Sequence, residues 1–128
     1  MTSESEIEAL ARRFFDSAEA GDIDGLVACY SADARIWHNT DEAEQSPAEN
    51  AETLNGFVQR ISKRRYAVRR LHVFPGGFVQ QHVLEGVRQD GAPVALPACI
   101  VCTVSDGKIT RLDEYFDSAR VATFLKLA

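Results

Sequence analysis

Residues 20–39 read AGDIDGLVACYSADARIWHN, and this stretch predicts two helices followed at once by a strand. Gly21 is typical of a helix end, because glycine adopts the left-handed conformation there at little cost. Asp22 is a good cap for a short second helix. That helix would bury Ile23, Leu26, Val27 and Tyr30. Residues 34–38 then alternate between apolar and polar side chains, which predicts a first strand.

Helices are also predicted on both sides of this stretch. Ser3 and Glu6 form a capping box at the start of the first helix, and Ser46 and Glu49 form another ahead of a third. Pro47 suits the first turn of that third helix. The expected buried stripes are Ile7, Leu10, Ala11, Phe14 and Ala18 in the first helix, and Leu54, Phe57, Val58 and Ile61 in the third.

From Tyr66 onwards the pattern changes to strands. We expect them at about 66–75, 77–88, 93–105 and 108–117, with turns marked by glycine, proline and aspartate. Ser118 would cap a last helical segment that buries Val121, Phe124 and Leu125. This order predicts an α+β fold in which helices gather on one face of a curved, mostly antiparallel sheet. The whole chain, 1–128, is expected to form one domain.

Composition favours a soluble protein that does not bind nucleic acid. The 128 residues carry a net charge of −5, whereas phosphate binding needs a cationic surface. A basic cluster at 60–70 could hold an anionic substrate or partner, or could be a solvated helix end and strand face. No apolar run predicts a membrane span or a signal peptide. We therefore expect a cytoplasmic location, no membrane contact, and unpaired thiols at Cys29, Cys99 and Cys102.

The order of the predicted elements resembles that of a known superfamily, and so do two segments, residues 20–39 and SDGKITRLDEYFDSA at 105–119. They are similar to the nuclear transport factor 2-like superfamily, especially its SnoaL-like and ketosteroid isomerase-like branches. The resemblance covers nearly the whole chain. The resemblance implies a cone-shaped, cystatin-like fold with a pocket on the concave face of the sheet. It also implies a homodimer formed through the opposite face of the sheet.

Steroid isomerases of this fold use an aspartate base at the end of the first strand, together with a tyrosine and a protonated acid that hold an oxyanion. By position, the base matches His38 or Asn39, the tyrosine matches Phe14, and the acid matches Cys99. All three positions differ in this chain. The resemblance therefore implies the scaffold and not the isomerase mechanism.

Strand alternation predicts which side chains face the pocket. If Cys99 faces inward, Ala95, Pro97, Val101 and Thr103 do so too. The family pattern then places His38, Gln80, His82, Glu114 and Phe116 on the same face, in an otherwise apolar bowl. Trp37, Asp113, Tyr115 and Asp117 would lie on the other face. A register slip of one residue would instead place Asp113 inward and Glu114 in solvent.

His38 is the first candidate for catalysis, because imidazole moves protons near neutral pH. It could also be a structural histidine bonded to a carbonyl. Glu114 would orient His38 or His82, since a buried carboxylate needs a partner. His82 is either a second proton carrier or a structural residue, and Asn39 either binds substrate or caps a turn. Phe14, Gln80, Cys99 and Phe116 complete the predicted substrate-binding set.

Three kinds of function fit these residues. The first is a cofactor-free isomerase, dehydratase or cyclase that acts by proton transfer on a small apolar carbonyl compound. The second is a non-catalytic protein that binds a small ligand, and the third is a dimeric interaction module on the same fold. The spacing of histidine and cysteine predicts no metal site, and no phosphate-binding or dinucleotide motif is present.

Overall fold

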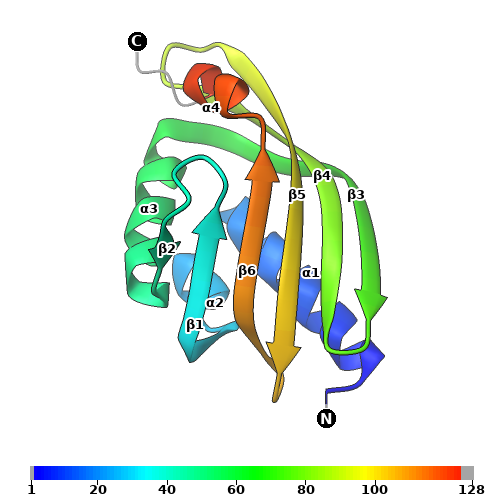
Figure 1. The fold of residues 1–128 in the computed structure, drawn as a ribbon. Coiled ribbons are helices and arrows are strands. Elements are labelled where there is room, and N and C mark those ends of the chain that lie inside the picture. Colours follow the sequence, from blue (N-terminus) through cyan, green and yellow to red (C-terminus); the bar gives the residue numbers. More distant parts are fainter. Residues whose placement is uncertain (1, 125–128) are drawn as a thin grey trace.

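Six strands form one curved sheet in the order β2-β1-β6-β5-β4-β3 in the computed structural model, which describes residues 2–124 (Figure 1). The strands are β1 (Tyr30–His38), β2 (Glu44–Gln45), β3 (Ile61–Phe74), β4 (Gly77–Arg88), β5 (Pro93–Ser105) and β6 (Lys108–Phe116). The helices are α1 (Glu4–Ala20), α2 (Ile23–Val27), α3 (Pro47–Arg60) and α4 (Ser118–Phe124). Among the strands of residues 2–124, only β1 and β6 pair in parallel. The predicted α+β fold is confirmed.

Helices α1, α2 and α3 cover one face of the sheet, and α4 lies at the end where β6 finishes (Figure 1). Both predicted capping boxes are present, at Ser3 with Glu6 and at Ser46 with Glu49. The α1 stripe packs with Phe15 and Phe78 into the main core, where these residues are buried. α1 therefore closes the lower part of the concave face, and α3 forms a side wall higher up.

Several predicted boundaries were wrong. Tyr30 begins β1 instead of ending the second helix, and Ile61 begins β3 directly after α3. Neither glycine nor proline occurs at the junction of α3 and β3, so the sequence gave no sign that the helix ends at Arg60. Asp117, not Ser118, caps α4, because its carboxylate accepts a hydrogen bond from the Ala119 amide. The two-residue strand β2 was missed, and the predicted contact of Leu125 lies outside the described residues.

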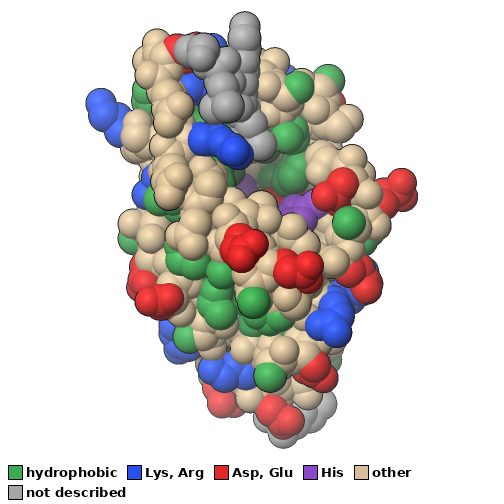
Figure 2. All heavy atoms as spheres, turned by 90° about the vertical axis from the view of Figure 1, so that its left-hand side faces the viewer, with side chains coloured by type: hydrophobic (Ala, Val, Ile, Leu, Met, Phe, Trp, Pro, Cys, Tyr) green, Lys and Arg blue, Asp and Glu red, His purple; other side chains and the backbone are tan. Residues whose placement is uncertain are grey.

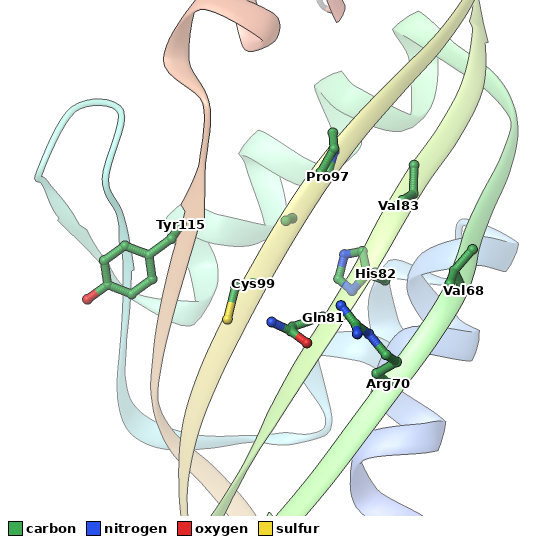
Figure 3. Close-up of a pocket in the computed structure, with 9 residues that line it drawn as sticks. Val68, Arg70, Gln81, His82, Val83, Pro97, Cys99 and Tyr115 are labelled. Atoms are coloured by element: carbon green, nitrogen blue, oxygen red, sulfur yellow. The ribbon is translucent and has the colours of Figure 1, made fainter.

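The faces of β5 were assigned the wrong way round. Cys99 pairs with Gln81 and Tyr115 in the outward-facing row, away from the helices (Figure 3). The inward row of β5 is Val94, Leu96, Ala98, Ile100, Cys102 and Val104. The physical reason is that β5 is apolar on both faces, so alternation alone does not choose between its two rows. All three cysteines are free, as predicted, with Cys99 and Cys102 on opposite faces.

Candidate functional site

A cavity of about 220 Å³ lies between the concave face of the sheet, α3 and α4. Figure 2 shows the hollow from outside, with histidine and hydrophobic side chains visible within it. Much of its wall is apolar, and includes Leu54, Phe57, Leu84, Leu96, Ala98, Phe116, Val121 and Phe124. The Phe57 and Phe124 rings stack at 6.1 Å, which joins α4 to α3 across the upper end. The shape suits a small, largely apolar molecule.

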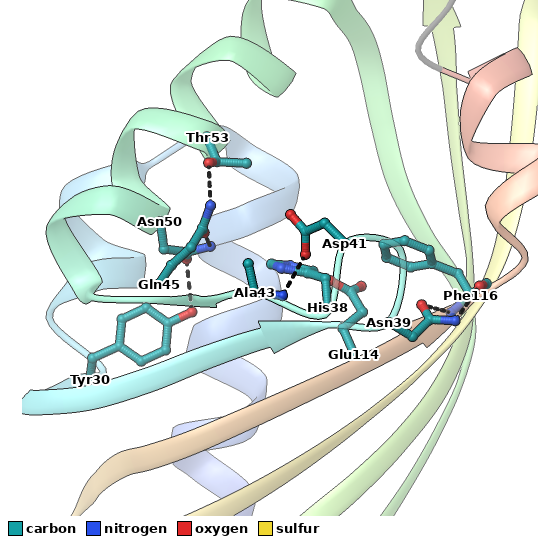
Figure 4. Close-up of polar contacts among 10 residues, drawn as sticks. All are labelled: Tyr30, His38, Asn39, Asp41, Ala43, Gln45, Asn50, Thr53, Glu114 and Phe116. Atoms are coloured by element: carbon teal, nitrogen blue, oxygen red, sulfur yellow. Dashed lines mark hydrogen bonds and ion pairs between the residues drawn. The ribbon is translucent and has the colours of Figure 1, made fainter.

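His38 and Glu114 meet in the wall of this cavity (Figure 4). They are directly opposite each other at the ends of the parallel strands β1 and β6, and His38 Nε2 lies 3.2 Å from Glu114 Oε1. Their side chains are 18% and 17% exposed. Burial lowers the pKa of His38, but the hydrogen bond and charge of Glu114, aided by Asp41, raise it by more. The protonated ring is therefore stabilised in place.

Of the two acidic neighbours, Glu114 faces inward and Asp113 faces outward. Asp113 pairs with Arg111 at 3.0 Å, and Arg111 also pairs with Glu44. Beside them, the rings of Trp37 and Tyr115 are 5.3 Å apart on the same outer face. The open choice of register is thus settled in favour of the His38–Glu114 pair.

Tyr66 is a candidate site residue that the sequence reasoning missed. It lies on β3, pairs with Leu84 in the inward row, and lines the cavity that holds His38 and Glu114. Burial is the main cause that raises the pKa of its hydroxyl, and the charge of Glu114 adds to this. The phenol therefore keeps its proton at neutral pH. Pairing counted from the turn at 75–76 would have placed Ala67 opposite Leu84, because a bulge near Val68 shifts the register by one residue.

His82 and Gln80 face inward as predicted, but neither side chain lines the main cavity. The His82 ring lies against Phe15 and Tyr66, with ring centroids 5.4 and 4.8 Å apart. Gln80 Nε2 lies 3.0 Å from His82 Nδ1, and His82 Nε2 has no hydrogen-bond partner among the described residues. Burial lowers the pKa of His82 to about 4. The structure thus keeps this pair behind Tyr66, in the core.

The other predicted binding residues are in different places. Phe116 lines the cavity, with its ring 6.1 Å from that of His38, whereas Phe14 lines a smaller cavity below. The side-chain Nδ2 of Asn39 donates to the backbone carbonyl of Phe116 at 3.0 Å, and its Oδ1 accepts from the backbone N–H of Phe116 at 3.1 Å (Figure 4). Both polar ends of Asn39 are therefore used to hold β1 and β6 together. Cys99 lies on the outer face and cannot contact a ligand in this cavity.

In the part of the chain that the structure describes, acidic, histidine and cysteine side chains do not cluster in a way that would bind metal. Within residues 2–124, no group of three such side chains is close enough to hold an ion. Over the same range, no helix is both long enough and apolar enough to cross a membrane. Beside His38, Glu114 and Tyr66, the polar side chains that line the cavity are Thr40, Asp41, Gln45, Thr53 and Arg60.

A family model described as the SnoaL-like domain matches residues 11–112, which include the second part of α1 and most of the sheet. The chain belongs to the SnoaL-like family. That match spans six of the elements that line the cavity, namely β1, β2, α3, β3, β4 and β5. No curated protein matches the sequence.

Solved structures share the fold at low sequence identity. A proposed polyketide cyclase from Xanthomonas campestris pv. campestris is 17% identical, with a TM-score of 0.86 over 96% of this chain and 98% of that one. AclR, a proposed hydroxylase from Streptomyces galilaeus, is 16% identical, with a TM-score of 0.85 over 98% and 100%. A Catenulispora acidiphila protein with a ketosteroid isomerase-like fold is 12% identical, with a TM-score of 0.80 over 93% of each chain. These likenesses confirm the ketosteroid isomerase-like fold of this SnoaL-like protein.

Proposed function

We propose that this SnoaL-like protein binds a small, largely apolar carbonyl compound and catalyses proton transfer on it without a cofactor, as an isomerase, dehydratase or cyclase. The observation that carries the proposal is the His38–Glu114 pair in the wall of a mostly apolar cavity. An apolar wall selects the body of the ligand, and a few polar groups orient its reacting end.

His38 is the proposed proton carrier, and Glu114 is its positioning residue. Because Nε2 faces the carboxylate, the neutral ring carries its hydrogen on Nε2 and has its lone pair on Nδ1. Nδ1 then accepts a proton from the carbon next to the substrate carbonyl. The positive charge that develops on the ring is stabilised by Glu114, in line with the raised pKa of His38.

The electrons of the broken C–H bond move towards the carbonyl oxygen, and Tyr66 is the proposed hydrogen-bond donor to that oxygen. A neutral donor placed where negative charge develops stabilises the transition state. Return of the proton to a different carbon gives an isomer. Loss of a neighbouring hydroxyl as water gives a dehydrated product, and attack of the carbon on a second carbonyl gives a ring. All three reactions share this first step.

A non-catalytic binding protein is the second candidate. The observation in its favour is that Phe14 stands where steroid isomerases have a tyrosine, and Cys99 faces away from the cavity. A protein of this kind would hold its ligand by the apolar wall alone. Its affinity would not depend on the protonation of His38.

A thermal-shift screen with steroids, aromatic polyketides and terpenoids tests the binding part of the proposal. We expect one of these classes to raise the melting temperature, since a ligand at 100 times its Kd adds about 2.7 kcal/mol of stability. Ala98→Phe would fill the cavity and abolish the shift. Ala95→Phe is the matched control, because it makes the same change on the exposed outer row of β5.

Two results would contradict the proposal. One is the absence of binding by every class at millimolar concentration. The other is equal binding by the wild type and by a folded Ala98→Phe variant, which would place the ligand elsewhere.

A further inference from the structure

A second, smaller cavity of about 40 Å³ lies beneath the main one, next to α1. His38, Leu54, Tyr66 and Glu114 line both cavities and so form the partition between them. A buried water needs only about 10–15 Å³ of this kind of space, together with two to four polar partners. The inner cavity therefore has room for at least one water, but not for a ring.

Polar groups reach the inner cavity from two sides. On one side the Tyr30 hydroxyl donates to Asn50 Oδ1 at 3.0 Å, and Asn50 Nδ2 donates to Gln45 Oε1 at 3.2 Å (Figure 4). Tyr30 and Asn50 are buried. Because the Tyr30 proton is already given to Asn50, its oxygen can only accept a further hydrogen bond from the cavity.

Glu114 lies on the other side of the inner cavity, and its carboxylate can also only accept. Within residues 2–124, His38 is the one side chain that forms an ion pair with it. A carboxylate has about four lone-pair sites, so Glu114, which is 17% exposed, can accept a further hydrogen bond on the side of the inner cavity. The Tyr30 oxygen and the Glu114 carboxylate are thus two acceptors on this cavity, which His38, Asn50 and Tyr66 also line, and a molecule that bridges the two acceptors must donate two hydrogen bonds.

We propose that the inner cavity binds ordered water, which donates hydrogen bonds to the Tyr30 oxygen and to the Glu114 carboxylate. Water is the small molecule that fits, because it has two hydrogens to give. Bound there, it completes the coordination of Glu114 and holds that carboxylate against His38. The site does not depend on the proposed function, and it can be tested without a substrate.

Oxygen-17 and deuterium magnetic relaxation dispersion of the solvent counts the long-lived internal waters of the intact protein. We expect Ala18→Val to lose at least one such water relative to the wild type, because Ala18 lines the inner cavity. Ala11→Val is the matched control: it is buried on the same helix but does not line the cavity. Equal counts in the wild type and in Ala18→Val would overturn the proposal.

Tyr30→Phe is the second variant, and it keeps the size of the side chain while it removes the acceptor. It should also lose the internal water, and the NMR titration midpoint of the His38 ring should move, because Glu114 has lost a partner. A packing role for Tyr30 would leave that midpoint unchanged. An unchanged water count together with an unchanged midpoint would overturn the site, whereas failure of the ligand screen alone would count only against the proposed function.

Discussion

Two inward-facing histidines have opposite electrostatic surroundings. His38 has a carboxylate beside it and a raised pKa, whereas His82 is 4% exposed among aromatic rings and has a pKa of about 4. Because the pKa of His38 is higher in the folded protein than in the unfolded chain, His38 stabilises the fold fully below about pH 6.5. This stabilisation is lost as the pH rises through the pKa that His38 has in the folded protein. The lowered pKa of His82 has the opposite effect on the pH dependence of stability. The stability conferred by His82 is complete above pH 6.5 and is lost as the pH falls towards 4.

The first prediction is that His82 makes the protein sensitive to mild acid. Between pH 7 and pH 4.5 the unfolded chain takes up a proton at this residue and the folded chain does not. The free energy of unfolding should therefore fall by about 2–3 kcal/mol more in the wild type than in His82→Phe. Urea unfolding at pH 7 and at pH 4.5 measures the change in the free energy of unfolding for the wild type and for His82→Phe.

His72→Gln is the control for this comparison, because it alters an exposed histidine and retains His82. It should lose as much stability as the wild type. Equal losses in His82→Phe and in the wild type would show that His82 is protonated in the native state or reaches solvent.

The strands differed in how well the sequence predicted which of their side chains face the cavity. The faces of β4, β6 and β1 were inferred from alternation together with the family pattern, which left Glu114 and Asp113 as alternatives for the inward position. The structure shows the first alternative, in which His38 meets Glu114. Strand β5 could not be oriented in this way, because residues 93–104 are apolar on both faces. The wrong face for Cys99 followed directly from that ambiguity.

Strand β3 was hard to predict for another reason. Its pairing with β4 slips twice, near Lys63 and near Val68, where the backbone φ is +51° and +53°. Such bulges insert an extra residue and bend the strand, so the side-chain alternation is interrupted. Single-sequence periodicity does not detect these slips, and Tyr66 lies between them. This is why the third polar group of the site was missed.

For the whole molecule, the outer face of the sheet leaves large apolar side chains in solvent. Val68 is 72% exposed and Tyr115 is 46% exposed, and Pro97, Cys99 and Val83 lie between them, beside the polar side chains of Arg70 and Gln81 (Figure 3). Such a patch is unusual on a monomer and typical of an interface. We propose, in line with the resemblance, that two copies associate through this face.

Light scattering at micromolar concentration should therefore give twice the chain mass of 14.1 kDa. Tyr115→Glu should give the single-chain mass, because it would bury a charge in the interface. Ala9→Glu adds the same charge on the exposed side of α1 and should leave the dimer intact. A wild type that stays monomeric would contradict this prediction.

The central claim is that the cavity performs proton transfer through His38. The most direct measurement is deuterium exchange into a bound carbonyl compound in D₂O, followed by mass spectrometry, for the wild type and for His38→Gln. We expect exchange at the carbon next to the carbonyl in the wild type, and a rate about 10²–10⁴-fold lower in the variant, with ligand affinity nearly unchanged. Wild-type exchange no faster than in buffer, or equal rates in the two proteins, would contradict it.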